Sequence, residues 1–184
     1  MGCDARIYDD LHLDGYETTI LKWTDHRQCK TVADYAQVLS SQIVERDSFA
    51  LIGISMGGIL AMELSKMINP KKVIIISSAR GRKELPGLYR FVGALHIYKA
   101  IPAAVIRFFS PVSVLVMGIR TKAGRKVFQQ MLKDTDKHFL KFCIAMVCIW
   151  DQNIEVGNSV HFHGDKDRTI PLRKVKNRKV VKGL

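Results

Sequence analysis

One stretch constrains the fold of this chain more than any other, because it joins an apolar run to a helical run through a turn of glycines and one serine. Residues 49–52 are wholly apolar, which is typical of a strand buried on both faces. Residues 53–58 read "GISMGG". Residues 59–67 have helical composition and spacing, and Pro70 stops the run soon afterwards. The sequence therefore predicts a strand, a sharp turn and a helix in direct succession.

Ser55 occupies the middle of this turn, with Gly53 two residues before it and Gly57 two residues after it. Glycines there remove the Cβ atoms that would collide in a sharp turn. Ser55 is then expected at a strained apex, beside a helix N-terminus that favours a developing negative charge. The backbone N–H of Met56 is a natural donor to an oxyanion. Ser55 is thus a candidate nucleophile; the alternative is an idle serine in a glycine-rich turn.

Strands and helices alternate along most of the rest of the chain, which indicates an α/β fold with a mostly parallel sheet. A helix is predicted over 31–46, with Thr31 or an earlier residue as its cap. Strands are predicted over 16–23, 71–79 and 159–164.

The middle of the chain, 86–150, breaks this alternation and is rich in large apolar residues. Charged residues and prolines interrupt every window long enough to cross a membrane, among them Lys99 and Pro102. The segment is better explained as short helices packed over the sheet, which would roof a site and supply an apolar pocket. Plain core helices are the alternative.

Composition and cysteine usage are those of an ordinary globular protein with reduced thiols. Its 184 residues suffice for one domain, and 47% of them are hydrophobic. Cys3, Cys29, Cys143 and Cys148 form no CxxC pair and no zinc-like spacing, which indicates reduced thiols in a cytoplasmic protein. The first ten residues lack the basic start and apolar core of a signal peptide.

The net charge of +12 lies almost entirely in the second half of the chain and is densest over 173–182, "RKVKNRKVVK". An anionic partner such as a nucleic acid or an anionic membrane is one interpretation. No aromatic residue lies in this stretch to stack on bases. A solvated surface is the preferred interpretation, and we expect little specific affinity for nucleic acid.

A second group of polar residues follows the strand predicted over 159–164. Asp165 and Asp167 lie in the loop after it, at the edge of a parallel sheet where Ser55 is also expected. A buried carboxylate in such a loop orients a histidine and stabilises its charged form. His161 and His163 share one face of the strand, where we expect them to pack and form hydrogen bonds. A metal site built from these histidines and Asp165 is the alternative.

The two motifs together resemble those of the α/β-hydrolase family. Residues 53–58 look like its nucleophile elbow, and 163–171 look like its HGxxDxxxP acid loop, with Asp167 in the acid position. The resemblance covers nearly the whole chain. It implies a three-layer α/β fold with a mostly parallel sheet, a hydrolase core over 1–85 and 151–184, and a helical cap over 86–150.

Both ends depart from the family pattern. The family begins with strands that this chain lacks, and one of them would lie between the strand at 16–23 and the elbow strand. The start of the chain resembles only the tail of the family's oxyanion loop, with Met1 or Gly2 near the donor position. Residues 178–184 look like the family's last strand, but no histidine follows His163. The chain therefore resembles a hydrolase truncated at both ends.

The resemblance implies a serine hydrolase that acts on a carboxylic ester or a related small acyl substrate, with no cofactor. Ser55 would attack the carbonyl, the N–H groups of Met56 and Gly2 would hold the oxyanion, and Asp167 would orient a histidine. No general base is assigned. Apart from His161 and His163, the histidines of the chain are His12, His26, His96 and His138, and nothing in their spacing recommends any of them. We expect weak or no activity from this chain, and the alternative is a non-catalytic protein whose basic C-terminal half binds an anionic partner.

Overall fold

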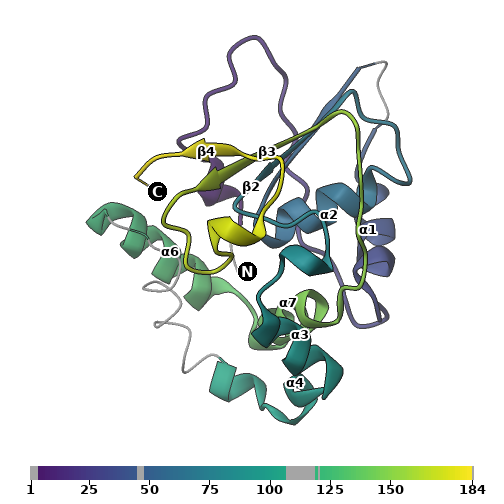
Figure 1. Ribbon diagram of the computed structural model, residues 1–184, viewed down its shortest axis with the longest axis vertical. Coiled ribbons are helices and arrows are strands. Elements are labelled where there is room, and N and C mark those ends of the chain that lie inside the picture. Colours follow the sequence, from purple (N-terminus) through teal and green to yellow (C-terminus); the bar gives the residue numbers. More distant parts are fainter. Residues whose placement is uncertain (1–3, 45–47, 107–118, 120, 184) are drawn as a thin grey trace.

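A parallel β-sheet lies in the upper half of the molecule as it is drawn in Figure 1, with the labelled helices between residues 87 and 149 below it. The computed structural model describes residues 4–44, 48–106, 119 and 121–183. Within them the sheet has four strands in the order β1-β2-β3-β4, all parallel. The strands are β1 (Ala50–Ile54), β2 (Lys72–Ile76), β3 (Ser159–Gly164) and β4 (Lys179–Val181). The predicted α/β fold with a parallel sheet is confirmed, and β3 has the predicted bounds.

The register of the sheet brings the carboxyl ends of the strands to one edge. Ile54 pairs with Ile76 at the ends of β1 and β2, and Ile76 pairs in turn with Phe162 near the end of β3. One face of the sheet is buried over β2 and β3, as shown by Ile75 on β2 and its partner His161 on β3. Residues that face the other way are only half-buried. This face is less completely covered than the apolar strand sequences predict.

Two helices lie side by side, and one of them packs against the strands. α1 (Val32–Ser40) begins at a capping box in which Thr31 and Asp34 each accept a hydrogen bond from the other's backbone N–H. It packs on α2 (Met56–Leu64), which contacts β1 and β2. α1 is shorter than predicted. At its end the hydroxyls of Ser40 and Ser41 donate to backbone oxygens three residues earlier, and such bonds compete with the helix.

The prediction of a strand over residues 16–23 is wrong. This segment forms no ladder with any described strand, and Tyr16 at its start is 77% exposed. The Gln42 side chain holds it instead, accepting from the backbone N–H of Lys22 and donating to the Lys22 carbonyl oxygen, both at 2.9 Å. A β-rich composition makes a strand only where a neighbour supplies hydrogen bonds and packing. Among the described residues no such neighbour lies beside this segment.

The described residues of the middle of the chain are mainly helical, as predicted. After η2 (Arg82–Glu84), they form α3 (Gly87–Ala94), α4 (Ile97–Ala100), α6 (Lys122–Asp134) and α7 (Lys137–Ile149). α3, α4 and α7 lie together at one end of the molecule (Figure 1). α3 approaches α7 so closely at Gly93 that a Cβ atom there would collide with the carbonyl group of Cys148. None of the helices in the described part of the chain has the length and apolar character needed to cross a membrane.

The main hydrophobic core is shared between these helices and the sheet. It combines buried residues of α1, α2, β2 and α7 in one cluster, including Tyr35, Met62, Ile75 and Met146. A buried polar contact joins the end of α7 to α2, since Trp150 Nε1 donates to Glu63 Oε1 at 2.7 Å. α7 is therefore part of the same packed interior as the elbow helix.

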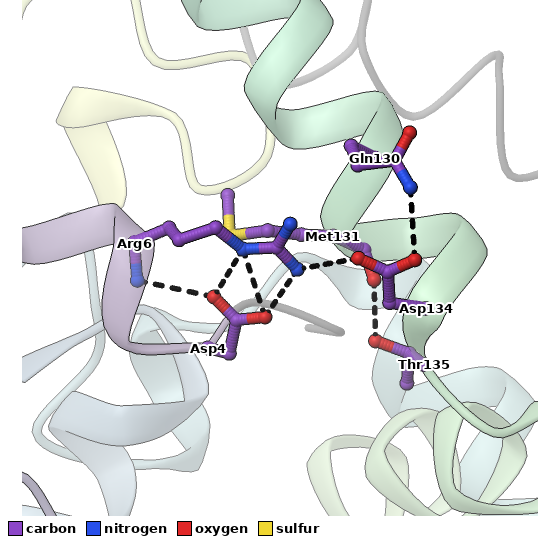
Figure 2. Close-up of polar contacts among 6 residues, drawn as sticks. All are labelled: Asp4, Arg6, Gln130, Met131, Asp134 and Thr135. Atoms are coloured by element: carbon purple, nitrogen blue, oxygen red, sulfur yellow. Dashed lines mark hydrogen bonds and ion pairs between the residues drawn. The ribbon is translucent and has the colours of Figure 1, made fainter.

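A second, smaller core ties the start of the chain to α6. The short helix η1 (Ala5–Tyr8) contacts α6, and its Ile7 packs on a cluster of buried residues. Figure 2 shows the polar contacts beside it. The Arg6 guanidinium donates to Asp4 and to Asp134 Oδ2, the latter at 2.8 Å, and Asp134 also accepts from Gln130. The residues of this cluster are Phe128, Met131, Leu132 and Leu140.

Residues between β3 and β4 are held by the side chains that follow β2. Glu84 accepts from the backbone N–H of Lys176 at 2.9 Å, and Arg80 donates to the carbonyl oxygens of Lys176 and Asn177. The short helix η3 (Leu172–Lys174) precedes this contact. These contacts fix the residues just before β4, which pairs with β3 at the edge of the sheet.

Candidate active site

Ser55 lies at the apex of the turn between β1 and α2, with φ 54° and ψ −119°. A positive φ is costly for a residue with a side chain, and such strain persists only where the surrounding structure enforces it. Here the Ser55 N–H donates to Ile76 O at 2.9 Å. The Ser55 carbonyl oxygen accepts from Gly58 N and from the Ser78 hydroxyl. The turn is thus fixed from both β2 and α2.

Two glycines of the motif are required by close contacts, but they are not the pair named from the sequence. A Cβ atom at Gly53 would collide with the backbone oxygen of Gly57 and lie 2.6 Å from Gly58 N. A Cβ atom at Gly58 would collide with the Ser78 side chain. At Gly57 the nearest atom to an added methyl group would be the Tyr8 hydroxyl at 3.7 Å, an ordinary contact. The prediction that a Cβ atom at Gly57 would collide within the turn was therefore wrong.

The first turn of α2 begins directly after Ser55, with Met56 as its first residue. The first N–H groups of a helix have no partner within the helix, so they are available to an anion at the helix N-terminus. This is the geometry expected for Met56 as an oxyanion donor. Gly2, the second expected donor, lies outside the described residues.

A small pocket opens beside Ser55. Its volume is about 20 Å³, room for about one water molecule. Apolar side chains from α2, α7 and the acid loop make up most of its wall, and Tyr89 of α3 adds a phenol ring. Its lining residues are Ser55, Met56, Ile59, Leu85, Tyr89, Val147, Thr169 and Ile170.

Asp167 lies in the loop after β3, at the same edge of the sheet as Ser55. Its Oδ1 accepts from the backbone N–H groups of Thr169 at 2.8 Å and Ile170 at 3.0 Å. Its Oδ2 lies 3.5 Å from His163 Nε2, and its side chain is 10% exposed. Because Thr169 and Ile170 also line the Ser55 pocket, the acid loop forms part of the pocket wall.

His161 and His163 both lie on the buried face of β3 and contact each other. Their ring centroids are 5.2 Å apart, and His163 Nδ1 lies 3.2 Å from His161 Nε2. Burial lowers the pKa of His161 to about 3. Asp165 is exposed and instead accepts from the backbone N–H of Gly183. The described residues hold no cluster of three or more side chains suited to a metal ion, so the metal alternative finds no support.

No general base can be assigned from the described pocket, since its wall contains no histidine, carboxylate or lysine. The rings of His26, Phe139 and Phe142 pack together. Three other histidines of the chain are exposed, namely His12, His96 and His138.

Two residues of the site had no sequence signal. Ser78 supports the Ser55 turn through its hydroxyl group, yet it follows an apolar strand like many loop serines. Tyr89 comes from the helical middle of the chain and lines the pocket. Burial, Cys148 and the charge of Asp167 raise the pKa of its hydroxyl, so Tyr89 remains a hydrogen-bond donor at neutral pH. Only the packing of α3 against the elbow reveals this role.

The sequence matches no protein-family model and no curated protein. Solved structures, in contrast, match over most of the chain. A lipase-esterase related protein from Clostridium acetobutylicum is 16% identical with a TM-score of 0.56, covering 83% of this chain and 66% of that one. MenH from S. aureus is 15% identical with a TM-score of 0.57, covering 88% and 69%. A thermophilic esterase from Thermogutta terrifontis is 14% identical with a TM-score of 0.56, covering 91% and 66%.

The chain has an α/β-hydrolase fold. At these low identities the likeness concerns the fold, and it agrees with the resemblance seen in the elbow and acid-loop motifs. The chain spans about two thirds of the length of the proteins it matches. The α/β-hydrolase fold thus accounts for the arrangement of Ser55 and Asp167 at one edge of the sheet, whereas the activity has to be argued from the site.

Proposed function

We propose that this chain is a serine hydrolase that acts on a carboxylic ester or a related small acyl substrate. The observation that carries the proposal is Ser55 at a positive-φ apex, at the N-terminus of α2, beside a pocket on the same edge as Asp167. Ser55 Oγ attacks the carbonyl carbon and forms a tetrahedral intermediate. The N–H groups of Met56 and Gly2 stabilise its oxyanion. The intermediate then expels the alcohol, which takes up a proton, and water hydrolyses the acyl-serine. Asp167 is the group that would orient a histidine base, and no histidine of the chain is assigned that role.

The helices between residues 86 and 150 act as a cap in this proposal. Tyr89 of α3 and Val147 of α7 line the pocket, which supports a role in substrate binding. The wall is mainly apolar, and this favours an apolar acyl or alcohol group in the substrate.

The rate is expected to be low. A serine hydroxyl is protonated and weakly nucleophilic at neutral pH without a base, and the described pocket wall contains no histidine. Loss of a triad member costs several orders of magnitude in rate, and the remainder comes from the oxyanion donors and binding. Turnover of an activated ester by the chain is therefore expected to lie close to that of its Ser55→Ala variant.

The proposal is tested by supplying the missing base in solution. Hydrolysis of p-nitrophenyl acetate is measured for the chain, for Ser55→Ala and for Ser65→Ala, a matched control at the far end of α2, across a range of imidazole concentrations. We expect imidazole to raise the rates of the chain and the control above that of Ser55→Ala. A fluorophosphonate probe is expected to label Ser55 slowly. Identical rates for all three proteins, with no labelling of Ser55, would refute a nucleophilic role.

A second candidate function is non-catalytic binding of an anionic partner. It is favoured by the exposed cations on β4 and on the residues that flank it, namely Arg173, Lys176, Arg178, Lys179 and Lys182. Only Lys179 of these cations lies on the edge strand itself, and no aromatic residue lies among residues 173–182 to stack on bases. We therefore expect any binding to be weak and purely electrostatic. A salt titration against labelled single-stranded DNA tests this expectation. Tight binding that persists at physiological salt would favour the binding function instead.

A further inference from the structure

The outer side of α3 is apolar although it is exposed to solvent. Leu88 is 69% exposed, Phe91 is 56% exposed, and Leu95, the residue directly after the helix, is 59% exposed. At about 100° of rotation per residue, these three side chains lie within about 60° of one another around the helix axis. They form one row along the helix, which we call the α3 stripe. Single exposed apolar residues are ordinary, whereas a contiguous group marks an interaction surface.

The other side of α3 is already packed. Gly93 is buried against α7, and the half-buried Tyr89 lines the Ser55 pocket. A helix on the surface of a globular domain ordinarily has one apolar side and one polar side. In α3 both sides are mainly apolar, and Arg90 is the one charged residue of the helix. The packing of α3 on α7 therefore accounts for one side of the helix and leaves the α3 stripe without a function.

The charge around the α3 stripe has one sign. Every charged residue from 85 to 133 is a lysine or an arginine. Arg90 on α3 and Lys99 on α4 are exposed, and α4 contacts α3. Lys141 of α7 donates to the Lys99 carbonyl oxygen at 3.0 Å, which brings a third cation beside α4. Of the carboxylates that flank this segment in the sequence, Glu84 is buried and Asp134 is paired with η1. An anionic surface would therefore be attracted to this part of the molecule.

The position of α3 in the molecule suits contact with an extended surface. α3 and α4 lie at one end of the long axis of the molecule, at the bottom of Figure 1, away from the sheet. A helix at such an end can lie flat on a surface while the sheet and the basic strand β4 stay clear of it.

The chemistry of the α3 stripe favours lipid over a protein partner. A second copy of the chain would bring Arg90 and Lys99 toward their own counterparts, because a two-fold contact joins like surfaces. A specific protein interface has about one hydrogen bond per 100–200 Å², and the exposed side chains of α3 other than Arg90 are all apolar. A lipid surface requires no such hydrogen bonds, because leucine and phenylalanine enter the acyl boundary and cations stay at the headgroups.

We propose that the α3 stripe, together with Arg90 and Lys99, docks this chain on an anionic lipid surface. Leu88, Phe91 and Leu95 enter the boundary between headgroups and acyl chains, and α3 lies in the plane of the interface. The two cations contact the lipid phosphates. The docking does not depend on hydrolysis at Ser55, and it uses a surface other than the basic residues over 173–182.

Binding of the chain to lipid vesicles tests the apolar part of the proposal. Cosedimentation is measured with vesicles of phosphatidylcholine alone and of phosphatidylcholine mixed with phosphatidylglycerol. We expect binding to the anionic vesicles, and loss of one inserted side chain in Leu88→Gln, Phe91→Gln or Leu95→Gln should weaken it by roughly tenfold. Val127→Gln is the matched control, since Val127 is an exposed apolar residue on another helix, α6. Equal affinities of Phe91→Gln and Val127→Gln would overturn the proposal, as would equal binding to both kinds of vesicle.

Charge variants distinguish this surface from the basic C-terminal stretch. Arg90→Gln and Lys99→Gln are each expected to weaken binding to the anionic vesicles by about fivefold. Lys179→Gln, on β4, is expected to change it little. Binding that Lys179→Gln abolishes and Arg90→Gln leaves intact would place the lipid contact on residues 173–182 and would refute docking through α3.

A tryptophan at position 91 reports insertion directly and does not rely on a loss of binding. We expect anionic vesicles with brominated acyl chains to quench the added fluorescence of Phe91→Trp, relative to the parent chain with Trp23 and Trp150. Absence of quenching would show that α3 does not enter the lipid and would refute the proposal. Light scattering without lipid tests the second copy as occupant. A dimer that Phe91→Gln dissociates would assign the α3 stripe to self-association and would overturn lipid docking.

Discussion

The contacts around the Ser55 turn predict opposite effects for alanine at two glycines of one motif. At Gly53 a Cβ atom would collide with the backbone of Gly57, and backbone atoms cannot rotate aside. At Gly57 the added methyl group would have the Tyr8 hydroxyl as its nearest neighbour at 3.7 Å. Gly57 also lies within α2, where alanine is the better helix former.

The magnitudes follow from these two geometries. Relief of the collision at Gly53 requires β1 and α2 to separate, and forced overpacking of this kind destabilises by about 3 kcal/mol or more. Gly57→Ala is expected to stabilise by up to about 1 kcal/mol, since alanine reduces the conformational freedom of the unfolded chain and favours the helix. The two variants should therefore differ by roughly 10 °C in Tm for a domain of this size.

Urea and thermal unfolding of the chain and both variants measure this difference. Circular dichroism reports the loss of helix, and the slope of the urea transition shows whether the native state remains compact. Equal destabilisation by both substitutions would refute the predicted difference between the two sites, because it would mean that Gly57 is as crowded as Gly53. A neutral Gly53→Ala would show that the turn is wider than the structure has it.

Three further results are expected. Trp150→Phe leaves buried Glu63 Oε1 without its donor, and urea unfolding should show a loss of about 1–3 kcal/mol. His161 has a pKa of about 3 when folded against 6.5 ordinarily, so below pH 6.5 the unfolded chain binds the extra proton. Stability should therefore fall by up to about 2 kcal/mol between about pH 7 and pH 5, and His161→Gln should reduce this slope in urea titrations. Arg6→Ala breaks a half-exposed pair with Asp134, and should shift the unfolding midpoint only slightly, with an even smaller shift in high salt.

The elements that were predictable from the sequence are those whose signals are local. The strand over 159–164 alternates between two faces and ends at a glycine, and it was found with its bounds. The turn at Ser55 was predictable because glycine, serine and a following helical run occur together within a few residues. The cap at Thr31 was equally local, since Thr31 and Asp34 satisfy each other's backbone donors.

The elements that were not predictable depend on partners distant in the sequence. Residues 16–23 have the composition of a strand, but composition does not reveal whether a neighbouring strand exists. The space around Gly57 is set by Tyr8, and the crowding at Gly58 by Ser78. Tyr89 reaches the pocket only because α3 packs against α7 near the elbow. None of these contacts leaves a periodicity or spacing in the sequence.

The sequence by itself determined the order of strands and helices from residue 31 onward, the sharp turn that presents Ser55, and the loop that carries Asp167. These follow from backbone preferences and hydrophobic spacing, which act over a few residues. The tertiary structure alone decided what surrounds them: the Ser78 hydroxyl on the Ser55 carbonyl oxygen, the phenol of Tyr89 in the pocket, and His163 beside Asp167 rather than free to reach the serine. The physical reason is that hydrogen-bond partners and burial depend on distances between segments, and those distances exist only once the sheet and its helices have packed.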